Sequence, residues 1–116
     1  MDAQIAYAVN QINAHEGKIS ISHLMNEVNL CQRHFERKFK LHTGFTPQKY
    51  NSIVRFKNAI KILRNESSDN LLSVAVKAGY YDASHLSREV KKLSGSTPNF
   101  FLSLPPDNET TIIYTK

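Results

Sequence analysis

The sequence of 116 residues has little cysteine and no long apolar run. Its single cysteine, Cys31, cannot form an internal disulfide, which predicts a reducing compartment, by default the cytoplasm. No apolar stretch approaches the roughly 18 residues that cross a bilayer. The first residues also lack the basic and apolar regions of a signal peptide. We therefore expect a cytoplasmic protein that neither enters a membrane nor is exported.

Residue patterns that support catalysis are also missing. The four glycines form no glycine-rich phosphate-binding loop, and no paired-carboxylate pattern is present. Cys31, His34 and His42 follow a C-x2-H-x7-H pattern, which lacks a fourth ligand and matches no standard zinc spacing. The sequence therefore predicts that the chain is not an enzyme and holds neither a metal nor a cofactor.

Positive charge is concentrated in one segment of the chain. Residues 31–64 carry nine Lys and Arg against one Glu, whereas residues 1–30 carry one Lys against three acidic residues. The net charge of the whole chain is +5. Such a concentration attracts phosphate, although a solvated helix face has the same composition. Charge alone leaves both interpretations open.

Apolar residues recur at helical spacing over nearly the whole chain, which predicts an all-α fold. Residues that favour helix starts and ends predict seven helices. Their expected ranges are about 3–14, a short helix between Ser20 and Asn29, about 32–42, about 47–64, a fifth from Asn70 to Ala78, about 83–93 and about 98–103. The long fourth helix is expected to bury one stripe of side chains, namely Tyr50, Ile53, Phe56, Ile60 and Leu63.

The second half of the chain repeats the first at an offset of 51 residues. The matching pairs are Gly44 with Gly95, Thr46 with Thr97, Pro47 with Pro98, His34 with His85, Arg37 with Arg88 and Lys40 with Lys91. Each unit reads as a short helix, a tight turn and a longer helix, which is the helix-turn-helix arrangement. We expect a first subdomain at 1–45, a linker helix at 46–64, a second subdomain at 65–104 and a tail at 105–116. The tail is β-prone but isolated, so it is expected to be disordered or to lie over the core.

The longer helix of each unit has an apolar side and a polar side. Phe35 and Phe39 in the first unit, and Leu86, Val90 and Leu93 in the second, are expected to point inward. The outward residues that can reach bases are Arg33, Glu36, Arg37, Ser84, Ser87 and Arg88. Those expected on phosphates are Gln32, Lys40, Lys91 and Lys92.

Arginine suits a position that faces DNA bases. Its guanidinium can donate two hydrogen bonds to N7 and O6 of guanine, so Arg37 and Arg88 are the leading base-reading candidates. Glu36 can accept from N4 of cytosine or can orient an arginine.

The chain resembles the DNA-binding domain of AraC/XylS-type transcription regulators over roughly residues 4–103. The most specific stretch is AGYYDASHLSR at 78–88, followed by Lys91-Lys92 and GSTP at 95–98. FERKFK at 35–40, GFTP at 44–47 and the linker-helix pattern of Arg55, Ala59 and Leu63 support it. The chain departs from the family pattern at Met25, Asn29, Cys31, Lys38 and Val90.

This resemblance implies two helix-turn-helix subdomains held by the long fourth helix. The recognition helices, at about 32–42 and 83–93, would enter adjacent major grooves about 34 Å apart on one face of double-stranded DNA. The implied function is regulation of bacterial transcription, with RNA polymerase as a candidate second partner. The family includes activators, and the residues leave open whether this chain is an activator or a repressor. A small-molecule effector would act only through a domain that this chain does not contain.

A helical protein-interaction module is the alternative function. Such a module would bind an acidic partner, for example an RNA polymerase subunit. The recurrence of Arg37 and Arg88 at equivalent positions favours DNA, because protein binding alone gives no reason for it. The residues leave open whether the chain is a freestanding regulator or the C-terminal part of a larger one.

Overall fold

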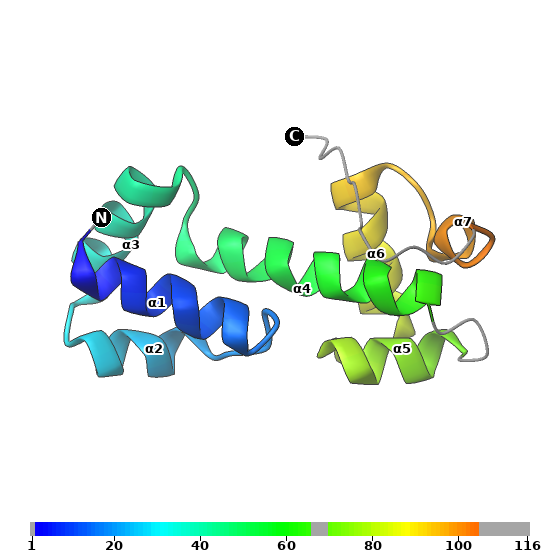
Figure 1. The fold of residues 1–116 in the computed structure, drawn as a ribbon, viewed down its shortest axis with the longest axis horizontal. Coiled ribbons are helices and arrows are strands. Elements are labelled where there is room, and N and C mark those ends of the chain that lie inside the picture. The colour runs from blue at the N-terminus through cyan, green and yellow to red at the C-terminus, as the bar shows by residue number, and fades with distance from the viewer. Residues whose placement is uncertain (1, 66–69, 105–116) are drawn as a thin grey trace. The chain divides into compact units, whose positions relative to one another are not determined.

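The computed structural model describes residues 2–65 and 70–104, and within them it is all-helical (Figure 1). The seven helices are α1 (Ala3–Ala14), α2 (Ile21–Val28), α3 (Gln32–Thr43), α4 (Pro47–Asn65), α5 (Leu71–Ala78), α6 (Ala83–Ser94) and α7 (Pro98–Leu102). The predicted all-α class with seven helices is confirmed, and the predicted ends differ by no more than a residue or so. None of these helices is long and apolar enough to cross a bilayer.

The chain divides into two compact units, Met1–Val54 and Arg55–Lys116. Unit 1 contains α1, α2, α3 and the first turns of α4, and unit 2 contains the rest of α4 with α5, α6 and α7. The predicted tail at 105–116 lies outside the described residues. So do residues 66–69 of the polar segment between α4 and α5.

Short polar side chains cap α2 and α5 where the sequence predicts. Ser20 Oγ accepts from the backbone N–H of His23 at 3.3 Å, and Asn70 Oδ1 accepts from that of Ser73 at 2.8 Å. Such bonds satisfy backbone donors that have no partner inside the helix. Asp2 and Asp82 cap α1 and α6 in the same way. These local bonds explain why the starts of α2 and α5 could be predicted from sequence.

The core of unit 1 forms where α1 lies against α2 and α3 (Figure 1). Its fully or nearly fully buried members are Ile5, Ala8, Ile12, Leu24, Val28, Phe35 and Phe39. Phe39 makes edge-to-face contacts with Phe35, at 5.7 Å between ring centroids, and with Tyr50 of α4, at 5.5 Å. The two inward phenylalanines predicted for α3 therefore anchor it on the rest of unit 1.

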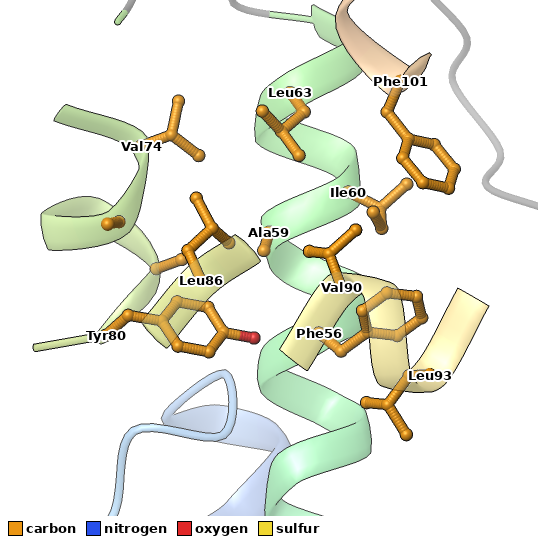
Figure 2. Close-up of a cluster of buried hydrophobic side chains, with 12 residues drawn as sticks. Phe56, Ala59, Ile60, Leu63, Val74, Tyr80, Leu86, Val90, Leu93 and Phe101 are labelled. Atoms are coloured by element: carbon orange, nitrogen blue, oxygen red, sulfur yellow. The ribbon is translucent and has the colours of Figure 1, made fainter. Parts of the chain in front are cut away.

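The core of unit 2 gathers residues from four helices and from the turn before α6. It consists of Phe56, Ala59, Ile60, Leu63, Val74, Ala75, Ala78, Tyr80, Leu86, Val90, Leu93 and Phe101. Figure 2 shows these side chains converging from α4, α5, α6 and α7. The three inward residues predicted for α6 are confirmed as buried.

The predicted core stripe of α4 is right only for its last three residues. Phe56, Ile60 and Leu63 are fully buried, but Tyr50 and Ile53 are half-buried. Tyr50 keeps its polar end at the surface, where its hydroxyl donates to Asn13 Oδ1 at 3.4 Å. Different stretches of α4 serve different cores, since Tyr50 packs on the unit 1 cluster and Phe56 belongs to that of unit 2. A single stripe along the whole helix was therefore the wrong expectation.

Candidate nucleic-acid interface

In unit 1, α2 and α3 are joined by a turn of three residues. Asn29, the predicted end of the short helix α2, adopts the left-handed conformation, with φ 57° and ψ 45°. The next N–H, of Leu30, bonds to Met25 O at 3.4 Å and closes the end of α2. The turn is therefore tight, and α2 and α3 form a helix-turn-helix in which α3 is the second helix.

The outer side of α3 carries a group of polar and cationic side chains. A surface hollow is lined by Gln32, Arg33, Glu36, Arg37, Lys40 and Thr46. It brings together every residue of the first unit that the sequence predicted to contact bases or phosphates. Arg33, Arg37 and Lys40 are exposed, and none forms an ion pair with a carboxylate within residues 2–65 and 70–104. Their positive charge is available to an outside anion.

Glu36 is the one acidic residue in this hollow, and two amide groups hold it. Gln32 Nε2 donates to Glu36 Oε1 at 3.0 Å, and Gln48 Nε2 of α4 donates to the same oxygen at 3.2 Å. Among the described residues these two amides, and no arginine, bond to Glu36. Sequence reasoning did not predict the contact of Gln48 with α3.

Lys38 lies on another side of α3 and joins it to the start of α1. Its Nζ lies 2.7 Å from Asp2 Oδ2 and donates to Gln4 Oε1 at 3.4 Å. The bond from Lys38 is the main cause that lowers the pKa of Asp2, and two backbone N–H groups of α1 add to it. Lys38 departs from the family pattern, and this contact shows what it does here. Because Asp2 and Lys38 are far apart in the chain, the pairing left no signal in the sequence.

In unit 2, α5 and α6 are joined by a slightly longer turn. Gly79 ends α5 with φ 90°, and the N–H of Tyr80 bonds to Ala75 O at 2.8 Å. Asp82 Oδ1 then accepts from the N–H of His85 at 2.7 Å and starts α6. This turn runs from Gly79 to Asp82 and is one residue longer than the turn between α2 and α3, and α5 and α6 form a second helix-turn-helix.

The outer side of α6 repeats the cationic character of α3. A surface hollow is lined by Leu71, Ser87, Arg88, Lys91, Lys92, Thr97, Pro98 and Asn99. The structure thus brings together all candidates of the second unit except Ser84, which is exposed at the start of α6 outside this hollow. Lys91 Nζ donates to Gly95 O at 2.9 Å and so caps the end of its own helix.

A polar network fixes the inner side of α6, and sequence reasoning missed it. Tyr80 Oη donates to Glu89 Oε1 at 2.8 Å, and Arg55 Nη2 of α4 lies 3.4 Å from Glu89 Oε2. Arg55 also lies over the Tyr80 ring, 5.1 Å from its centroid. Glu89 and Arg55 are 12% and 17% exposed, so the pair is largely shielded from water. Only the spacing of His85 and Glu89, four residues apart on α6, was a local signal for it.

These groups can recognise a ligand by hydrogen bonding and charge. Guanidinium and ammonium groups bind phosphates and guanine edges, and hydroxyls bind either. Within the described ranges, no three His, Cys, Asp or Glu side chains gather where they could hold a metal ion. The hollows therefore match polyanion recognition better than any metal-assisted chemistry.

Comparison with known proteins gives a consistent family assignment. A family model described as "Helix-turn-helix domain" matches residues 24–103. The HTH-type transcriptional activator RhaS of Pectobacterium atrosepticum is 29% identical over 86 residues, which are 74% of this chain and 30% of that protein. The chain thus spans about a third of the length of the curated relatives it matches.

Solved structures share the fold at low sequence identity. One is the DNA-binding domain of AdpA, a global transcriptional factor, in complex with a target DNA. It has a TM-score of 0.78 and 21% identity, over 88% of this chain and 92% of that one. Another is the C-terminal domain of AraT, a response regulator from Geobacillus stearothermophilus. It has a TM-score of 0.81 and 18% identity, over 95% of this chain and 93% of that one.

Proposed function

The chain belongs to the AraC-type helix-turn-helix family, and on this premise we propose that it binds double-stranded DNA sequence-specifically and regulates bacterial transcription. In this proposal α3 and α6 are the two recognition helices, and they enter adjacent major grooves of one duplex. A single chain then covers two half-sites, so the basic binding event requires no dimer.

One observation carries the proposal. The second helix of each helix-turn-helix presents an exposed arginine and an exposed lysine at repeat-equivalent positions, Arg37 with Lys40 and Arg88 with Lys91. Core packing accounts for a repeated apolar side, but it gives no reason to repeat an exposed cationic one. A ligand with repeating negative charge, such as a duplex read in two successive grooves, gives that reason.

The candidate residues divide into two roles. Arg37 and Arg88 read guanine through their paired N–H donors, and Arg33, Ser84 and Ser87 add further base contacts. Gln32, Lys40, Lys91 and Lys92 contact phosphates, which set the register of each helix on the duplex without reading sequence.

The relatives support a role as a transcriptional activator, and we propose the cytoplasm as its place of action. RhaS is described as a transcriptional activator, and the AdpA domain was solved with a target DNA. Contact with RNA polymerase, and control by a small molecule through a further domain, belong to the proposal for the whole regulator. The function proposed for this chain is binding and not catalysis.

Selection of bound sequences from random duplex DNA tests the proposal. The expected result is two preferred blocks about one helical turn apart. Arg37→Ala should weaken the preference in one block and Arg88→Ala in the other, each by about tenfold. Lys61→Ala, which removes an exposed cation of α4 outside both hollows, is the matched control and should leave both blocks unchanged.

Two results would contradict the proposal in different ways. Equal loss of affinity for selected and random DNA in both arginine variants would show that these residues contact phosphate only. Failure of the chain to retain any duplex would favour the helical protein-interaction module instead.

A further inference from the structure

We infer that Glu36 is a preset hydrogen-bond acceptor that makes the unit 1 half-site select cytosine at one base pair, with Gln32 and Gln48 as positioning residues. The inference rests on the proposed function, because it names the base that α3 would read. It also assigns a role to Gln48, which lies on α4 and outside both recognition helices.

The geometry around Glu36 fixes one carboxylate oxygen and leaves the other available. Both amide donors, Gln32 Nε2 at 3.0 Å and Gln48 Nε2 at 3.2 Å, bond to Oε1. Gln32 lies one turn earlier on α3, whereas Gln48 comes from the first turn of α4. Two donors on different helices restrict the rotation of the side chain, and Oε2 has no hydrogen-bond partner among the described residues.

The surroundings of Glu36 keep this carboxylate on the cationic face without neutralising it. It lines the same hollow as Arg33, Arg37 and Lys40. Since none of these cations pairs with it directly in the described ranges, each is free to bind DNA. The surrounding positive charge also offsets the repulsion that a carboxylate would otherwise meet near phosphates.

A carboxylate discriminates between base edges because it only accepts hydrogen bonds. In the major groove cytosine presents the N4 amino donor, whereas guanine presents two acceptors and thymine one. Adenine places its N6 donor beside the N7 acceptor, which repels a second carboxylate oxygen. A restrained carboxylate at this position therefore favours cytosine and disfavours the other three bases.

Unit 2 lacks this arrangement, so the two half-sites should differ. The residues that the repeat places at the positions of Gln32, Glu36 and Gln48 are Ala83, Ser87 and Asn99. Ser87 and Asn99 line the hollow of unit 2, but a serine hydroxyl both donates and accepts and so discriminates poorly. α3 thus carries a side chain that only accepts hydrogen bonds, Glu36, and α6 carries none at the matching position.

The test is selection from random duplex DNA with the wild-type chain and the variants Glu36→Gln, Gln48→Ala and Ser87→Ala. The wild-type chain should select cytosine at one position of one block. Glu36→Gln should shift that position toward adenine, because a glutamine amide matches N6 and N7 together. Gln48→Ala should lower the preference for cytosine by about threefold or more, since the carboxylate is then less restrained. Ser87→Ala is the matched control and should change only the other block.

The outcomes separate this inference from the proposed function. Preferred blocks that remain the same in Glu36→Gln and Gln48→Ala would overturn the inference and leave the proposed function intact. A wild-type chain that selects no sequence would contradict both. The thermal midpoint of each variant is measured beside the selection. If Glu36→Gln is destabilised, Gln48→Ala decides the question, because it removes an exposed side chain and one hydrogen bond.

Discussion

The hydroxyl of Tyr80 donates to Oε1 of Glu89 at 2.8 Å and thereby joins the turn before α6 to the inner side of that helix. Burial is the main cause that raises the pKa of Tyr80, and the negative charge of Glu89 adds to it. Arg55 of α4 contacts both residues, through its Nη2 and through the face of its guanidinium. The rotation of α6, and with it the direction of Arg88, therefore depends on a contact with α4.

Tyr80→Phe should lower the free energy of unfolding by about 1.5–3 kcal/mol, which is typical of a lost hydrogen bond to a charged group. Tyr80 is only 4% exposed, so water cannot easily replace the lost donor to Glu89. Urea denaturation measures the change. Tyr81→Phe is the matched control, because Tyr81 is 90% exposed and its change should stay within about 0.5 kcal/mol. Equal effects of the two substitutions would show that the Tyr80 bond adds nothing to stability.

Asp2→Asn should destabilise the chain near pH 7 and have no such effect in strong acid. The contact with Lys38 lowers the pKa of Asp2 below its ordinary value of 3.8. A lowered pKa means that the contribution is complete above pH 3.8 and is lost as the pH falls through the folded-state pKa. Thermal unfolding of both chains from pH 7 to pH 2 measures the difference. In a Lys38→Met background the pH dependence should become smaller, because only the backbone N–H groups of Gln4 and Ile5 then lower the pKa of Asp2. A pH dependence of unchanged size there would assign the effect to the helix cap alone.

Asn29→Ala should lower the free energy of unfolding by about 1–2 kcal/mol, because alanine adopts the left-handed conformation at a cost of that size. Asn29 has φ 57° and is exposed, so little else changes at this site. Asn29→Gly is the control and should retain the stability, since glycine has no Cβ to clash. Thermal or urea unfolding distinguishes them. If both variants lost the same stability, the asparagine side chain and not its backbone would be responsible.

Lys40→Ala should weaken binding to selected and random DNA by the same factor and reduce the salt slope of binding by about 1. Lys40 is exposed beside Arg37 in the hollow of α3, where its flexible ammonium suits a phosphate better than a base edge. Titrations at several salt concentrations measure the slope. Lys61→Ala should leave it unchanged. Loss confined to the selected sequence would instead make Lys40 a base-reading residue.

The sequence by itself determined the seven helices, the caps at Ser20 and Asn70 and the inward residues of α3 and α6. These features depend on groups within about four residues of one another, such as Asn70 with Ser73 or the left-handed Asn29 at the end of α2. The repeat also indicated that Arg37 and Arg88 occupy equivalent outer positions. Local hydrogen bonds and helical periodicity depend on residues that are close together in the sequence, so they can be predicted without the tertiary structure.

Only the tertiary structure decided which polar groups hold the recognition helices in place. Gln48 reaches Glu36 across 12 residues, and Arg55 reaches Glu89 across 34. Lys38 in the middle of α3 contacts Asp2 at the start of α1. The tertiary structure also decided which core each part of α4 joins, since Tyr50 packs on the unit 1 core and Phe56 belongs to the unit 2 core. Such contacts depend on how separate helices pack against one another. Hydrophobic periodicity specifies which side of a helix is buried, but it does not specify which polar side chains of other helices will contact that helix.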